Sequence, residues 1–129
     1  MSGHIEHDGD YRAAPGHAWY QVDQMGGCAV VRVGGEIDAR TVHEFHQVVT
    51  EAASLATHIV IDLEHVSFID SSGLGGLIAA RNTSNERDGS FSLVGPPPMV
   101  RRLLGSTRLH DVLPIYNSLP EAVNAASGR

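Results

Sequence analysis

The sequence lacks the features that would tie it to an oxidising compartment, a membrane or nucleic acid. It has a single cysteine, Cys28, which excludes an internal disulfide and is expected to be a small buried hydrophobe in its apolar run. No apolar stretch approaches the roughly 20 residues of a membrane-spanning helix, and the N-terminus lacks the apolar core of a signal peptide. Positive charge is scarce, and the net charge of −6 disfavours nucleic acid and anionic membranes as partners. We therefore expect a cytoplasmic protein.

The composition is that of one globular domain. The chain has 129 residues, of which 42% are hydrophobic and 19% are charged. This is enough to bury a core without disulfides or a structural metal. Residues 1–17 are polar, glycine-rich and without apolar periodicity, so we predict a flexible N-terminal arm there. Residues 18–129 are predicted to form the folded domain.

Apolar residues alternate between strand-like and helix-like spacing along the chain. We predict strands at residues 19–22, 28–33, 58–63, 90–94 and 113–116, the second of them closed by Gly34 and Gly35. Helices are predicted from Thr41 to residue 55, from residue 71 to an end among residues 82–85, at residues 99–104 with Gly105 at the end, and at residues 119–126. This order is typical of an α/β fold with a mainly parallel or mixed sheet of about four or five strands and about four helices.

The segment before the first predicted helix offers two candidate caps. Asp38 or Thr41 can accept hydrogen bonds from the unpaired N–H groups of the first turn. Glu44, three residues after Thr41, completes a capping-box pattern. For Asp38 a contact to a partner protein is the alternative, and the residue type alone leaves both open.

The most informative run is Ile69–Leu77 (Ile-Asp-Ser-Ser-Gly-Leu-Gly-Gly-Leu), which follows the apolar segment 59–63 and the short link 64–68. It predicts a strand leading into a helix whose first turn carries two hydroxyl groups. A helix start has unpaired N–H groups and a partial positive charge, so it suits a capping oxygen or a phosphate. Taken alone, Asp70, Ser71 and Ser72 are more often capping residues than a phosphorylation site.

The same helix begins with an unusual number of glycines. Gly73, Gly75 and Gly76 each cost about 1 kcal/mol relative to alanine in a helix interior. Such a cost indicates that something approaches the backbone closely. Either a neighbouring strand or the docking surface of a partner protein accounts for it, and the sequence leaves both open.

Signatures of enzymes and cofactors are weak in this sequence. The Gly-x-Ser-x-Gly motif of serine hydrolases does not occur, and Ser71 has no histidine and acid partners in a suitable order. Gly73 and Gly75 do not belong to a dinucleotide fingerprint, because its third glycine would fall at Ile78. His43 and His46 have ligand-compatible spacing but no clear third ligand, which favours solvated helix surface. We predict no catalytic residues, no metal and no cofactor.

Several of these elements together resemble a known family. The run Gly35–Asp38 (Gly-Glu-Ile-Asp), the strand 58–63 and the run Phe68–Gly75 resemble the STAS domain, and more narrowly the bacterial anti-sigma factor antagonists. The run Met99–Leu104 followed by Leu109 also matches, so the resemblance covers about residues 19–126. It implies a STAS-type α/β domain with a partner-switching role.

What the resemblance implies is a cycle of binding and phosphorylation. Members of that family bind an anti-sigma factor that is also an ATP-using serine kinase, and so free a sigma factor. The kinase phosphorylates the first serine of Asp-Ser-Ser-Gly, which breaks the complex, and a metal-dependent serine phosphatase restores it. In this sequence the phosphorylated residue would be Ser71. The implied partner-binding residues are Asp38, Asp70, Ser71, Ser72, Gly73, Leu74 and Gly75.

A second role within the same family stays open. STAS domains also serve as phosphorylation-independent subunits of lipid-transport or stress-signalling complexes, and as cytoplasmic parts of anion transporters. The intact serine pair and its acidic flank favour the phosphorylation-controlled switch. In either role the protein is expected not to be an enzyme.

Overall fold

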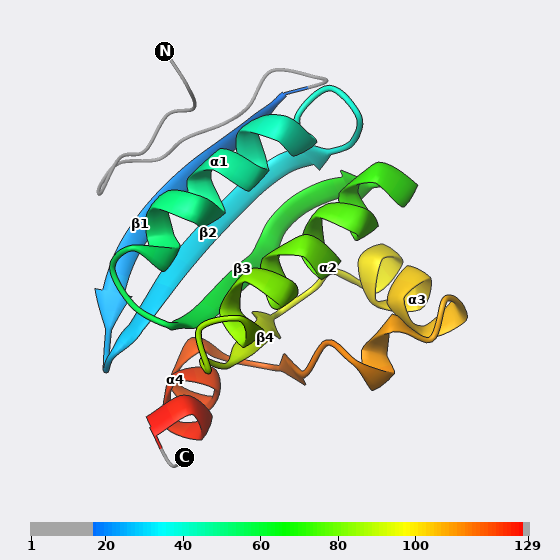
Figure 1. The fold of residues 1–129 in the computed structure, drawn as a ribbon. Coiled ribbons are helices and arrows are strands. Elements are labelled where there is room, and N and C mark those ends of the chain that lie inside the picture. Colours follow the sequence, from blue (N-terminus) through cyan, green and yellow to red (C-terminus); the bar gives the residue numbers. More distant parts are fainter. Residues whose placement is uncertain (1–16, 128–129) are drawn as a thin grey trace.

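A computed structural model describes residues 17–127, so the predicted arm over residues 1–17 lies outside the described residues except for His17. The elements follow the predicted order of strands and helices (Figure 1). They are β1 (Ala18–Met25), β2 (Cys28–Ile37), α1 (Val42–Ala53), β3 (His58–Ile69), α2 (Ser71–Asn85), β4 (Phe91–Val94), α3 (Pro98–Ser106), a short 3-10 turn (Leu109–Asp111), β5 (Ile115–Tyr116) and α4 (Leu119–Ser127).

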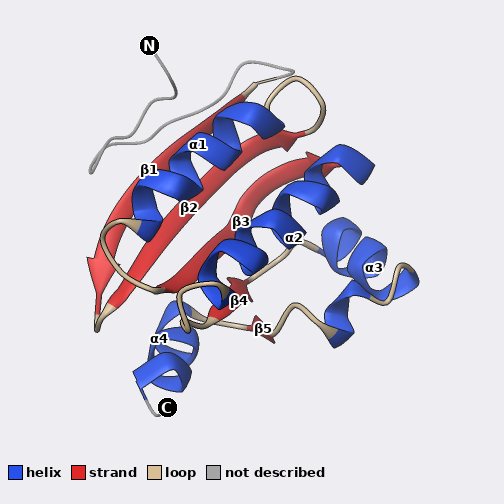
Figure 2. Cartoon of the chain, in the orientation of Figure 1, coloured by secondary structure: helices blue, strands red, loops and turns tan. Residues whose placement is uncertain are grey.

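The strands form one mixed sheet, which confirms the predicted α/β fold. Its five strands lie in the order β1-β2-β3-β4-β5. The first pair is antiparallel and the other three pairs are parallel. Helices α1, α2 and α3 cover one face of the sheet, and α4 packs on part of the other (Figure 2). We call this second, partly covered face the open face.

Two apolar cores hold these layers together. The larger one lies between the sheet and α1, α2 and α3, where Phe45, Leu77 and Leu104 are fully buried. The smaller one lies under α4 and includes Cys28, whose thiol has a raised pKa because it is buried. The prediction that Cys28 is a buried hydrophobe is thus confirmed. No helix in residues 17–127 is long and apolar enough to cross a bilayer.

Strands β2 and β3 run further than the sequence predicted. Gly34 and Gly35 do not close β2, and residues 64–68 are not a link but part of β3. The glycine at position 34 serves a close contact instead of a turn, because a Cβ there would lie 2.1 Å from the indole of Trp19. Two shifts in the β2–β3 register also hide the strand period over this stretch. The extension carries both strands to the same edge, where Ile37 pairs with Ile69.

Helix α3 differs slightly from its prediction. It begins at Pro98, where a missing backbone N–H is harmless, and it continues through Gly105 to Ser106. Gly105 therefore does not end the helix as predicted. The backbone N–H of Thr107 closes it by donating to the carbonyl of Leu103 at 3.1 Å.

Candidate functional site

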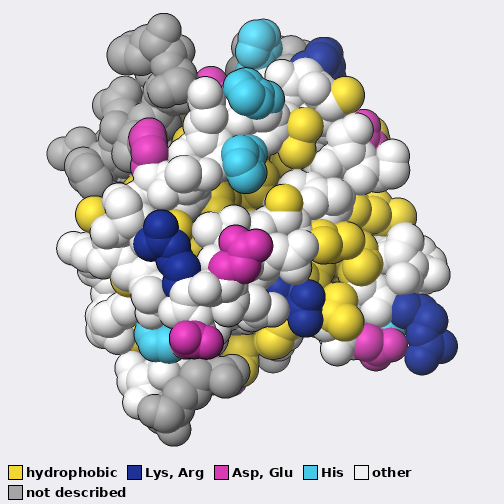
Figure 3. Space-filling view, viewed as in Figure 1, with side chains coloured by type: hydrophobic (Ala, Val, Ile, Leu, Met, Phe, Trp, Pro, Cys, Tyr) yellow, Lys and Arg dark blue, Asp and Glu magenta, His cyan; other side chains and the backbone are white. Residues whose placement is uncertain are grey.

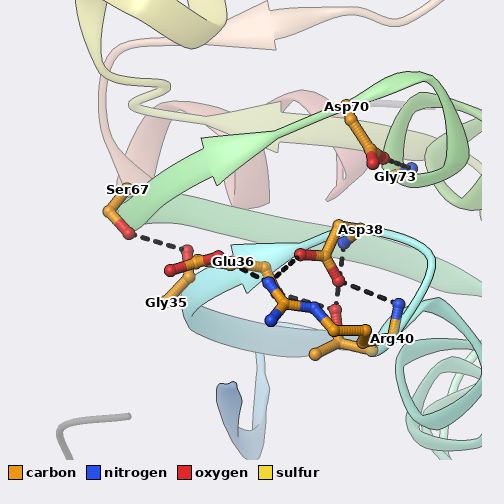
Figure 4. A network of polar contacts seen from close by, with 8 residues as sticks. Gly35, Glu36, Asp38, Arg40, Ser67, Asp70 and Gly73 are labelled. Atoms are coloured by element: carbon orange, nitrogen blue, oxygen red, sulfur yellow. Dashed lines mark hydrogen bonds and ion pairs between the residues drawn. The ribbon is translucent and has the colours of Figure 1, made fainter. Parts of the chain in front are cut away.

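The carboxyl ends of β2 and β3 lie side by side and form the candidate site. We call this region the serine edge: residues 37–41 at the end of β2 and in the loop after it, and residues 70–75 at the start of α2. The backbone N–H of Asp70 donates to the carbonyl of Ile37 at 3.3 Å, which ties the two segments together. Figure 4 shows Asp70 and Gly73 on one side of this edge and Asp38 and Arg40 on the other.

Asp70 is the cap of helix α2. Its backbone is extended, and its Oδ1 accepts a hydrogen bond from the backbone N–H of Gly73 at 3.0 Å. The interpretation of Asp70 as a capping residue is therefore confirmed. Ser71 follows as the first helical residue and is exposed, and its hydroxyl makes no hydrogen bond within residues 17–127. The interpretation of Ser71 as a capping residue is wrong, since Asp70 already fills that position.

The glycines of α2 divide into two kinds. A Cβ on Gly73 would lie 2.2 Å from the carbonyl oxygen of Ile37, so this glycine lets the helix rest on the end of β2. A Cβ on Gly76 would lie 2.8 Å from Val42, so this one lets α1 and α2 pack. Gly75 is exposed and has nothing within 4 Å of its Cβ position. Packing explains Gly73 and Gly76 and leaves Gly75 unexplained.

Ser72 and Leu74 complete the first turn of α2. Ser72 is half-buried, whereas the Leu74 side chain points into the larger core and is 8% exposed. Of the residues singled out in this run, Ser71 and Gly75 are therefore the most exposed, and Asp70 and Ser72 are half-buried. The others support that surface from below.

Asp38 is buried in the loop after β2 and bonded within it. Its Oδ1 accepts from the backbone N–H of Arg40 at 2.9 Å, and its Oδ2 accepts from Nη2 of Arg40 at 2.7 Å. The same Nη2 also donates to Oε1 of Glu36 at 3.0 Å. The hydrogen bond from Arg40 holds the pKa of the Asp38 carboxyl below its usual range. Figure 4 shows the Arg40 guanidinium lying between these two carboxylates.

The predicted capping box at the start of α1 does not form. Thr41 is the N-terminal cap residue by position, but its hydroxyl makes no capping bond. Instead the hydroxyl donates to the carbonyl of Glu36 at 2.7 Å and accepts from the backbone N–H of Asp38 at 3.0 Å. The Thr41 hydroxyl, which the capping box requires, is therefore bonded within the loop instead. Asp38 caps the turn that leads into α1: its Oδ1 accepts from the backbone N–H of Arg40 at 2.9 Å, and its backbone carbonyl accepts from the N–H of Val42 at 2.8 Å.

Arg40 is the residue of this edge that the sequence reasoning missed. Its side chain is 63% exposed, although one of its nitrogens is held by Glu36 and Asp38. The available signal was an arginine two residues after an aspartate and four after a glutamate, at the end of β2 and in the loop that follows it. The arginine neutralises part of the negative charge that the two carboxylates bring to the edge.

The described residues show little that could hold a metal ion. In residues 17–127 no three His, Cys, Asp or Glu side chains lie close enough to do so. His43 and His46 are exposed on α1, and Figure 3 shows histidine side chains gathered on this face of the molecule.

A polar pocket lies away from the serine edge, on the open face. It has a volume of about 310 Å³, and its lining includes Arg32, Asp62, His65 and Ser118. Burial raises the pKa of Asp62 above its usual range. Nε of Arg32 lies 3.8 Å from Oδ2 of Asp62, which is too long for a hydrogen bond.

The fold and this edge define the class of protein, and comparison with known proteins agrees. Residues 20–122 match the STAS domain family. The chain belongs to that family, as the motifs at residues 35–38 and 68–75 predicted.

Similar proteins have related names. The anti-sigma F factor antagonist of Paenibacillus polymyxa is 31% identical over 100 residues, which cover 76% of this chain and 86% of that protein. The anti-sigma-B factor antagonist of Staphylococcus aureus is 36% identical over 84 residues, covering 64% of this chain and 78% of that protein. The crystal structure of an anti-sigma factor antagonist from Mycobacterium paratuberculosis has a TM-score of 0.77 and 33% identity, covering 89% of this chain and 98% of that one.

Proposed function

We propose that this protein is an anti-sigma factor antagonist that is switched off by phosphorylation of Ser71. In the unmodified form it binds an anti-sigma factor with serine kinase activity, and a sigma factor is released. The kinase phosphorylates Ser71 and the complex dissociates, and a serine phosphatase restores the binding form. The protein is then a substrate of a kinase and not an enzyme, and it acts in the cytoplasm. The names of the similar proteins support the antagonist role.

The observation that carries this proposal is the position of Ser71. Its hydroxyl is exposed at the first residue of α2, while Asp70 provides the capping bond. A phosphate on Ser71 therefore breaks no hydrogen bond that the helix needs. The positive end of the helix dipole tolerates the added charge, a contribution of about 0.3–1 kcal/mol. The fold is expected to stay intact in both forms.

The phosphate acts on the partner through charge. It adds a charge of about −1.5 to −2 and three acceptor oxygens to a surface that was a small neutral hydroxyl. A partner docked on Ser71, Ser72 and the unexplained Gly75 must then desolvate or oppose that charge. A loss of about 4 kcal/mol of binding free energy weakens the affinity roughly a thousandfold. That is enough to switch the complex off without refolding.

The test combines mass spectrometry with a binding assay. The wild type, Ser71→Ala and Ser71→Glu are incubated with ATP and candidate anti-sigma kinases from the same genome, with Ser72→Ala as the matched control. We expect one added phosphate in the wild type and in Ser72→Ala, and none in Ser71→Ala. Binding should persist in Ser71→Ala and be lost in Ser71→Glu.

The opposite result is equally informative. A folded protein that gains no phosphate and captures no kinase would refute the switch. That result would favour a phosphorylation-independent STAS subunit of a lipid-transport or stress-signalling complex. Ser71 would in that case be an exposed residue of the first turn of α2 without a regulatory role.

A further inference from the structure

Arg40 uses only part of its hydrogen-bonding capacity. Nη2 donates to Asp38 and to Glu36, at 2.7 and 3.0 Å. Within residues 17–127, Nε and Nη1 make no hydrogen bond, and the side chain is 63% exposed. An arginine has five N–H donors, so three of them, one on Nε and two on Nη1, stay available on this guanidinium. The loop therefore holds a pre-oriented cation that still has free donors.

We propose that Arg40 binds the phosphate of phosphorylated Ser71 through Nη1 while Nη2 stays on Asp38. The inference rests on the proposed function only in taking Ser71 as the residue that carries the phosphate. It assigns to the loop after β2 a second task, which is to supply the counter-ion for the modified serine.

The arrangement of the strands brings the two residues within reach. Ile37 and Ile69 are paired in neighbouring strands, whose spacing is about 4.8 Å. Arg40 follows Ile37 by three residues and Ser71 follows Ile69 by two. The contact between Gly73 and the Ile37 carbonyl presses the start of α2 against the loop side of the edge. A long, exposed side chain on the loop can therefore meet a phosphate on the first residue of the helix.

The negative charge at the serine edge favours a contact between the phosphate and Arg40. The carboxylates that face this region are Glu36 and Asp38 on the β2 side and Asp70 on the α2 side. A dianionic phosphate added next to them is strongly repelled unless a cation intervenes. A hydrogen bond from a guanidinium to a phosphate is charge-assisted, and such bonds are shorter and stronger than neutral ones. Arg40 is already held among these carboxylates and lies where such a cation is required.

The experiment measures the phosphate directly and needs no kinase. Phosphoserine is incorporated at position 71 during synthesis, and the second pKa of the phosphate is followed by ³¹P NMR. The free group has a second pKa of about 6. The variants are Arg40→Gln, Arg40→Lys and, as a matched control on exposed helix surface, Arg102→Gln. Each titration is repeated in 1 M NaCl, where the screening length falls to about 3 Å.

A direct contact and a remote field give different results. With a contact, Arg40→Gln raises the phosphate pKa by about one unit, and most of that difference persists in 1 M salt. Arg102→Gln leaves the pKa unchanged. Arg40→Lys keeps the charge, but its single ammonium nitrogen cannot hold Asp38 and the phosphate with separate nitrogens, so it gives an intermediate value. It also decides the question if Arg40→Gln does not fold.

Two outcomes overturn the inference. One is an equal phosphate pKa in the wild type and in the folded Arg40 variants, and the other is a difference that vanishes in high salt. Neither outcome touches the proposed function, because the phosphate is installed without any kinase. Conversely, a failure to find phosphorylation by a kinase leaves the titration result standing as a property of the edge.

Discussion

Two buried aspartates, one at the serine edge and one in the open-face pocket, have opposite pKa shifts. Each lies near an arginine. At the serine edge Nη2 of Arg40 is 2.7 Å from Asp38 and donates to it, and the pKa of Asp38 is lowered. In the pocket Nε of Arg32 is 3.8 Å from Asp62 without a hydrogen bond, and burial raises the pKa of Asp62. Both regions contain an arginine, but the pKa of the aspartate shifts in opposite directions.

The difference lies in the geometry of each arginine. The tight loop that begins at Asp38 brings the backbone N–H and the side chain of Arg40 onto the same carboxylate. Arg32 extends from the middle of β2, where the sheet fixes its direction, and its Nε is buried without a hydrogen-bond partner within the described residues. At the serine edge the negative charge of Asp38 is therefore balanced by Arg40, and the edge can accept additional negative charge. The pocket holds a carboxylate that disfavours ionisation.

The largest expected effect comes from breaking the serine edge with Gly73→Ala. The added methyl group would overlap the Ile37 carbonyl, which is backbone and cannot move aside. We expect the free energy of unfolding to fall by about 1–3 kcal/mol in denaturant titrations. Gly75→Ala is the control, since it meets open space and should gain up to about 1 kcal/mol. Equal effects of the two substitutions would show that the helix does not rest on β2 as described.

The next effect is expected from Asp38→Asn, which removes the charge but not the shape. Because the folded pKa of Asp38 is lowered, its charge stabilises the protein above the unfolded pKa of about 3.9. That stabilisation is lost as the pH falls through the folded pKa. The variant should melt below the wild type at pH 7, and the gap should close under more acidic conditions. A gap that is independent of pH would contradict the prediction.

Asp62→Asn should give a smaller effect of the opposite sign. The folded pKa of Asp62 is raised, so its contribution is fully present below the unfolded pKa and is lost as the pH rises through the folded pKa. The melting temperature of the variant should therefore rise relative to that of the wild type between pH 4 and pH 7. Its Oδ1 can still accept from the backbone N–H of Glu64, a bond of 3.0 Å in the wild type. A melting-temperature difference that stays constant across that pH range would contradict the opposite pKa shifts of Asp62 and Asp38.

The smallest effect on stability is expected from Arg32→Met. The substitution keeps an apolar stem and removes a buried nitrogen that has no partner, so stability should change by no more than about 0.5 kcal/mol. The positive charge of Arg32 nevertheless lowers the pKa of Asp62, in opposition to burial. Carboxyl NMR should therefore show a further rise of the Asp62 pKa in the variant. No change would mean that the two groups do not interact.

The alternation of strand and helix patterns in the sequence predicted the fold. Predictions from local residue patterns were wrong where contacts between distant parts of the chain determine the conformation. Gly34 and Gly35 are typical of a turn, yet Gly34 is required by the indole of Trp19 from the neighbouring strand. The capping box was wrong because the hydroxyl of Thr41 binds the carbonyl of Glu36. Glu44 instead lies near Tyr20, whose pKa is raised by burial and by that carboxylate.

The candidate site was predicted in part for the same reason. Asp70 and Gly73 follow rules of a helix start, which are local, and the structure confirms Asp70 as the cap. The role of Gly73 depends on the carbonyl of Ile37, 36 residues earlier in the chain by sequence number, so only the folded sheet reveals it. Arg40 has no motif of its own. Its importance comes from a loop that aims two carboxylates at one nitrogen.

The stacking of Trp19 on Gly34 has an optical consequence. The chain has one tryptophan, and its ring lies on the open face with its centroid 5.8 Å from that of His65. Tryptophan emission from this protein therefore originates at one place in β1, on the far side of the sheet from α2. A ligand that reaches over the sheet changes the colour of that emission, whereas one confined to the helices leaves it unaltered. Trp19 is thus an intrinsic fluorescent probe of the open face of the sheet.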